Sequence, residues 1–140
     1  TKAIIVTACS NVIGAVPDMQ RIYNVSRKNG LTLIIDASQS AGTMPMDISQ
    51  YEQTIVCFTG HKGLYGPQGT GGIVVNGDFA FKPVFSGGSG IHSFDKTHPA
   101  TMPDVFEAGT MNVPSFAGLT AGCAYIEQLG QENAAARILF

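Results

Sequence analysis

Apolar and polar residues follow two different periods along the chain, and together they predict an α/β fold. Apolar, largely β-branched runs at 3–6, 31–35 and 54–58 are typical of buried strands. Between the first two runs, apolar residues continue at helical spacing from a first turn at Pro17 to a glycine stop at Gly30. Strand, helix and strand within about thirty residues predict a βαβ unit with parallel strands.

The same patterns divide the rest of the chain. Residues 47–53 predict a short helix before the third strand, and 72–75 predict a fourth strand. Because the connection to this fourth strand holds no helix, we expect it to pair antiparallel with the third. The apolar residues of 85–103 follow neither a helical nor a strand period, which predicts a long loop. A helix with apolar positions as far as Leu129 follows, and residues 134–140 also lie in a helical pattern.

Polar residues follow each predicted parallel strand at the point where it ends. They are Thr7, Asp36 and Thr59. The carboxyl ends of parallel strands meet at one edge of a sheet, and ligands of open α/β sheets bind there. We therefore expect the functional site at this edge.

Composition narrows the possible partners. The chain has 140 residues, 13% of them charged, and a net charge of -2 without a basic run, which argues against nucleic acid and anionic membranes. We expect no signal peptide and no membrane span, because no apolar stretch is long enough. Cys9, Cys57 and Cys123 lack metal-ligand spacing. They predict buried free thiols, no metal site and a cytoplasmic protein.

Lys62 is the most conspicuous charged residue, because it directly follows the third strand in a segment of mostly apolar and glycine residues. Burial would lower the pKa of such a lysine and make it an amine nucleophile, although a surface lysine on a loop has the same sequence. Lys62 and Asp36 could form a buried ion pair. They are also the pair that pyridoxal phosphate needs, a lysine for its aldehyde and a carboxylate for its ring nitrogen. Thr59 and His61 could anchor its phosphate.

The glycine-rich segments offer a different hypothesis, a nucleotide site. Glycines 63–72 are not followed by the lysine and hydroxyl residue of a phosphate-binding loop, and 87–90 open no evident helix after a strand. The sequence therefore supports a nucleotide-binding domain only weakly.

Four ordered segments carry a resemblance to a known family. They are 9–14, 36–42, 59–69 and 106–112. They resemble class V aminotransferases, in particular the branch of cysteine desulfurases and selenocysteine lyases, and the resemblance covers nearly the whole chain. It implies a three-layer α/β sandwich with a mainly parallel sheet and one antiparallel strand, as in the large domain of pyridoxal-phosphate-dependent transferases.

The resemblance also implies roles for single residues. Lys62 would hold pyridoxal 5'-phosphate as a Schiff base and later act as the catalytic base, and Asp36 would pair with the pyridine nitrogen. Gln39 would hydrogen-bond the phenolic oxygen of the ring, and Asn11 would lie near the same oxygen or the substrate.

Phosphate binding and assembly follow from the same resemblance. Thr59 and His61 would hold the phosphate, whereas Thr110 would reach the phosphate of the neighbouring subunit's cofactor. The implied assembly is thus a homodimer with shared active sites.

We expect residues 1–140 to be the central part of a pyridoxal-phosphate-binding large domain, inactive alone. The family's upstream phosphate loop, its stacking aromatic ring and its small domain, with a substrate-binding arginine and a mobile cysteine, would lie in the parent protein. The expected activity of the parent removes sulfur or selenium from cysteine or selenocysteine, leaving alanine, and could pass sulfur to an acceptor protein. Transamination, another β-elimination and a non-catalytic interaction or dimerisation remnant are the alternatives.

Overall fold

The computed structural model describes residues 1–91 and 94–138 and divides into two compact units. One unit comprises residues 1–77 and the chain from Pro114 onward, and the other comprises 78–113. Residues 92–93, in the predicted long loop, and 139–140, in the predicted terminal helix, lie outside the described residues.

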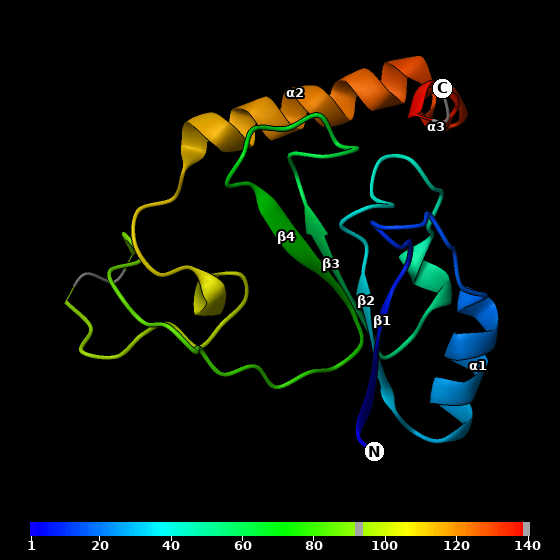
Figure 1. Ribbon diagram of the computed structural model, residues 1–140. Coiled ribbons are helices and arrows are strands. Elements are labelled where there is room, and N and C mark those ends of the chain that lie inside the picture. The colour runs from blue at the N-terminus through cyan, green and yellow to red at the C-terminus, as the bar shows by residue number, and fades with distance from the viewer. Residues whose placement is uncertain (92–93, 139–140) are drawn as a thin grey trace. The chain divides into compact units, whose positions relative to one another are not determined.

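The first unit is built on a four-stranded sheet with strands in sequence order (Figure 1). The strands are β1 (Ala3–Thr7), β2 (Thr32–Asp36), β3 (Thr54–Thr59) and β4 (Gly71–Asn76). The β1–β2 and β2–β3 pairs are parallel, and β3–β4 is antiparallel because the short connection reverses the chain. This confirms the predicted α/β fold with a mainly parallel sheet and one antiparallel strand.

The register brings the polar strand ends together. Thr7 pairs with Asp36 between β1 and β2, and Asp36 pairs with Cys57 between β2 and β3. Thr59 follows two residues later at the end of β3. The three strand ends therefore share one edge, as the sequence predicts.

Helix α1 (Met19–Lys28) forms the crossover between β1 and β2. Asp18 is its N-cap, and its side chain accepts a hydrogen bond from Arg21 N at 2.9 Å. Pro17 and Asp18 therefore precede the helix instead of forming its first turn. An exposed ion pair joins Arg27 to Glu52 at 2.9 Å and contributes little to stability.

The core lies on one face of the sheet, beneath α1. Leu33 and Ile35 alternate along β2, are 0% exposed and pack with Val56 of β3. Met19, Ile22 and Tyr23 from α1 cover them. On the other face Ile5 is 74% exposed, so the second helical layer of a three-layer sandwich stays a prediction.

Two other predicted helices differ in detail. The segment predicted as a helix at 47–53 forms only one 3-10 turn, η1 (Ile48–Gln50), because the chain leaves helical conformation at the C-cap Tyr51 (φ -117°, ψ 81°). Helix α2 (Val113–Leu129) is followed by a separate short helix, α3 (Gln131–Ile138). The break lies at Gly130, whose φ of 81° interrupts the helix.

The second unit has little regular structure. Its described residues contain one 3-10 turn, η2 (Asp104–Phe106). The described part of the predicted long loop contains no helix or strand. Val105, 1% exposed, is its buried centre, and the rings of Phe81 and Phe106 pack edge to face with centroids 4.9 Å apart. No helix within the described ranges is long and apolar enough to cross a membrane.

Candidate functional site

Asp36 ends β2 at the shared edge and is held by the loop that follows. Its Oδ1 accepts a hydrogen bond from Ser38 N at 2.9 Å. Hydrogen bonds from the Ser38 side chain and backbone lower the pKa of Asp36; burial opposes them with a smaller effect, and the positive charge of Lys62 makes the smallest contribution, also lowering it. Asp36 is therefore an ionised carboxylate at neutral pH. The Asp-Ala-Ser spacing is typical of an Asx turn and could have revealed Ser38 in the sequence.

Lys62 lies on the loop between β3 and β4, close enough to Asp36 for its charge to act there. Thr59 Oγ1 lies 2.7 Å from His61 Nδ1, so the hydroxyl fixes the imidazole ring beside the lysine. Both His61 and Lys62 are exposed, so the burial expected of Lys62 is not seen among the described residues. Four of the predicted site residues nevertheless gather at one place.

The other three predicted site residues are not joined to this group by hydrogen bonds between described side chains. Asn11 is exposed in the turn after β1, and Gln39 is half-buried in the loop after β2, both at the same edge as Asp36. Thr110 belongs to the second unit, where it is exposed. Their predicted roles stay predictions.

The loops after β2 and β3 touch through their backbones, which sequence reasoning missed. A Cβ built on Gly63 would lie 2.5 Å from Ala41 O, and one on Gly42 would lie 2.3 Å from Gly63 O. Any side chain at either position would therefore separate the Asp36 loop from the Lys62 loop. The glycines at 42 and 63 were visible in the sequence, but their contact depends on the folded backbone.

An apolar cavity of about 370 Å³ lies behind these loops in the same unit. Its wall includes Phe58, Leu64 and Leu119, with Cys123 among them. The three cysteines are free, as predicted, but they are half-buried, not buried.

Cys57 offers a test of the Asp36 environment. Burial raises the pKa of its thiol, and the negative charge of Asp36 raises it further. Replacing Asp36→Asn removes that charge, so we expect the midpoint of the pH–rate profile for Cys57 alkylation to move to lower pH, because the thiolate is the reacting form. Peptide mass spectrometry after iodoacetamide treatment measures it.

Asp47→Asn is the matched control, since Asp47 is a capping carboxylate at η1. It should leave the Cys57 midpoint in place. An unchanged midpoint in Asp36→Asn would contradict the proximity of the two side chains.

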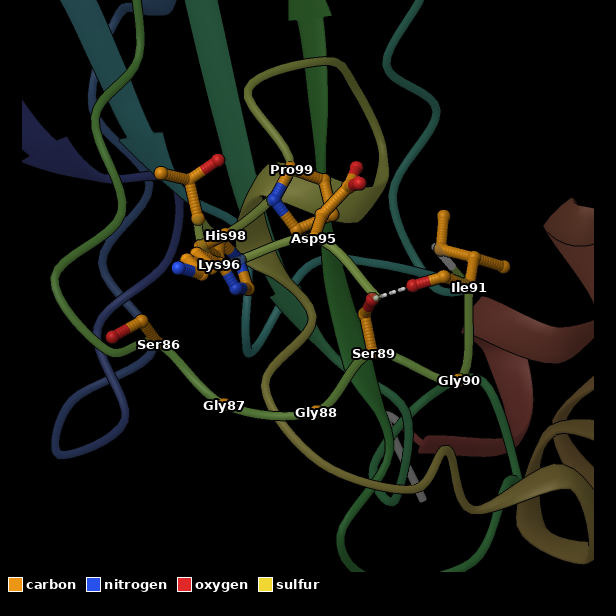
Figure 2. A pocket seen from close by; sticks show the side chains of 11 residues that line it. Ser86, Gly87, Gly88, Ser89, Gly90, Ile91, Asp95, Lys96, His98 and Pro99 are labelled. Carbon is orange, nitrogen blue, oxygen red and sulfur yellow. Dashed lines mark hydrogen bonds between the residues drawn. The ribbon is translucent and has the colours of Figure 1, made fainter. Parts of the chain in front are cut away.

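The second unit contains a hollow of about 400 Å³ (Figure 2). Gly87, Gly88 and Gly90 form one side of it, with Lys96 and His98 also lining it. His98 Nε2 lies 3.3 Å from Val105 O, while its buried Nδ1 has no partner among described atoms. Among the described residues, no helix directly follows these glycines, since the next element is the 3-10 turn η2, so they do not form the loop and helix N-terminus that cradle phosphate in nucleotide-binding folds.

Comparison with known families gives a direct match. The family model described as "Aminotransferase class-V" matches residues 1–139. The chain belongs to the class-V aminotransferase family. This confirms the family that the four sequence segments resemble.

Relatives within this class-V family include proteins named as cysteine desulfurases. The chain is 34% identical over 136 residues to "Probable cysteine desulfurase" of Pyrococcus abyssi, covering 92% of the chain and 33% of the relative. It is 35% identical over 121 residues to "Cysteine desulfurase CsdA" of Escherichia coli, covering 84% and 30%. The chain thus spans about a third of the length of these relatives.

Solved structures give the same assignment of fold. A cysteine desulfurase from Thermococcus onnurineus NA1 matches with a TM-score of 0.79 at 32% identity, over 93% of this chain and 34% of that one. A cystine C-S lyase, C-DES, solved with its product cysteine persulfide, matches with a TM-score of 0.80 at 30% identity, over 94% of this chain and 37% of that one.

Among described residues, no three His, Cys, Asp or Glu side chains are placed to hold a metal ion.

Proposed function

We propose that these residues form the central part of the pyridoxal-phosphate-binding large domain of a longer, cysteine desulfurase-like enzyme. The observation that carries the proposal is that the end of β2 and the loop after β3 bring the Asp36 carboxylate and Lys62 to one sheet edge, where Thr59 and His61 are already in contact. The relatives named as cysteine desulfurases support the choice of reaction.

The donor set fits pyridoxal phosphate. The amine of Lys62 suits the aldehyde, and the Asp36 carboxylate suits a protonated ring nitrogen. The Thr59 hydroxyl and the His61 ring, already in contact, suit the phosphate. Gln39 and Asn11, from the two loops at the same edge, are proposed for the phenolic oxygen or the substrate.

When bound, the cofactor supplies an electron sink for the carbanion formed at the substrate's α-carbon. The chain's own residues then have separate tasks. Asp36 would keep the ring nitrogen protonated, because its lowered pKa leaves the carboxylate negatively charged at neutral pH. Lys62 Nζ would hold the cofactor through its aldehyde and would also be placed to accept and return the substrate's protons.

The substrate and partners belong to the same proposal. We infer cysteine or selenocysteine as substrate and a cytoplasmic homodimer in which Thr110 reaches the neighbouring subunit's cofactor phosphate. A sulfur-acceptor protein would then take the sulfur from the enzyme. The close structural match to a cystine C-S lyase favours a second candidate, β-elimination from cystine or a related amino acid.

Product analysis separates these activities. The complete enzyme that contains this chain is incubated with pyridoxal phosphate and either cysteine or cystine. We expect alanine and protein-bound persulfide from cysteine. Pyruvate and ammonia would instead assign a β-eliminating lyase, and a keto acid formed only with an added 2-oxo acid would assign an aminotransferase. Absence of every product would favour the non-catalytic remnant.

A further inference from the structure

The loop that carries Lys62 closes on itself through backbone hydrogen bonds. At its base, Gly60 N–H donates to Thr70 O at 2.8 Å. Further along, Gly66 N–H donates to Gly60 O at 2.8 Å, and Tyr65 N–H donates to Lys62 O at 3.0 Å. Lys62 therefore stands on a compact loop whose position is set at residues 60 and 70.

The Thr70 side chain is packed inside the loop, next to the Gly60–Thr70 backbone pair at its base. It is buried, 6% exposed, and its Oγ1 donates to Pro67 O at 2.6 Å. A Cβ built on Gly60 would lie 2.2 Å from Thr70 Oγ1 and 3.0 Å from Leu119 Cδ1. The hydroxyl thus fills the space that a side chain at position 60 would need. Packing this close leaves the base of the loop little freedom to shift.

The Lys62 side chain is itself exposed, and within the described part of the chain no hydrogen bond holds it. Its place beside Asp36 must therefore follow from the backbone of the loop. We propose that Thr70 is a positioning residue for Lys62: its buried hydroxyl, bonded to Pro67 O and packed on Gly60, fixes the loop that presents the lysine to Asp36. This inference rests on the proposed function, which takes Lys62 as the residue that binds the cofactor.

Covalent labelling tests the proposal in the complete cofactor-free protein. Pyridoxal phosphate is added, borohydride traps the adduct, and peptide mass spectrometry gives the labelling rate of Lys62 relative to Lys28 of α1. Thr70→Val keeps the shape but removes the hydroxyl, so we expect Lys62 labelling to slow about three- to tenfold. Thr70→Ser retains the hydroxyl and should stay within about twofold of the wild type.

Thr54→Val is the matched control. Thr54 is 0% exposed, and its Oγ1 donates to Glu52 O at 3.2 Å at the other end of β3. The control loses the same kind of buried hydrogen bond on the same strand, far along it from Lys62. Equal slowing in Thr54→Val and Thr70→Val would overturn the proposal, because both variants would then act only through general stability.

Amide hydrogen exchange provides a readout that needs no cofactor. The amides of Gly60 and Gly66 should exchange faster in Thr70→Val and in Gly60→Ala, whose new Cβ displaces the hydroxyl, but not in Thr54→Val. If wild-type Lys62 labels no faster than Lys28, the proposed cofactor role fails. Amide exchange then decides the role of Thr70 alone: faster exchange supports a fixed loop, and unchanged exchange overturns it.

Discussion

Replacing Lys62→Ala is expected to abolish borohydride-trapped cofactor on the peptide that contains residue 62 and to lower turnover of the complete enzyme by at least about 10³-fold. The physical reason is that one amine performs both tasks assigned here, binding the aldehyde and moving the substrate's protons. Alanine can do neither. Peptide mass spectrometry after reduction, together with alanine release from cysteine, measures both effects.

Two further variants distinguish the loss of the Lys62 amine from the loss of its positive charge. Lys62→Arg retains the positive charge near Asp36 but has no primary amine, so it should also lose the trapped adduct. Lys28→Ala removes a lysine from the last turn of α1, outside the site, and should behave like the wild type. Full trapping and turnover in Lys62→Ala would rule out the lysine as the cofactor-binding residue.

The elements that the sequence predicts well are those with local causes. The sequence predicts β3 at 54–58 and the strand extends over Thr54–Thr59, because a short apolar run rich in β-branched residues favours a buried strand. The antiparallel β4 follows from the short connection before it. The meeting of Asp36 and Lys62 follows from parallel strands, whose carboxyl ends share an edge.

Features that depend on distant parts of the chain could not be predicted. The contact between Gly42 and Gly63 arises only when two loops from different strands approach each other. Tyr65, with φ 56°, adopts a left-handed conformation that its residue type does not favour, and its ring packs edge to face on Tyr125 of α2. Tertiary packing overrides local preference at such positions.

Replacing Leu33→Ala is expected to destabilise the sheet around the site by about 3 kcal/mol, within the range for leucine-to-alanine substitutions in a core. Leu33 is 0% exposed and pairs with Ile4 of β1 and Thr54 of β3, so little room remains for the neighbours to fill the cavity. Amide exchange of β2 in the complete protein measures the effect. The hydrogen bonds from Leu33 N to Gln53 O (3.1 Å) and from Ala37 N to Cys57 O (2.8 Å) report opening at each end of the strand.

Protection of these amides should fall about 10²-fold in Leu33→Ala, because about 1.4 kcal/mol corresponds to tenfold in the opening equilibrium. Arg27→Ala is the control: it removes only an exposed ion pair with Glu52 from α1, so it should change protection less than about threefold. Equal effects of the two substitutions would show that the buried face of β2 does not carry the stability. Loss of amide protection in Leu33→Ala alone would show that the core also maintains the site. Asp36 ends the same strand and keeps its place beside Lys62 only while β2 stays paired.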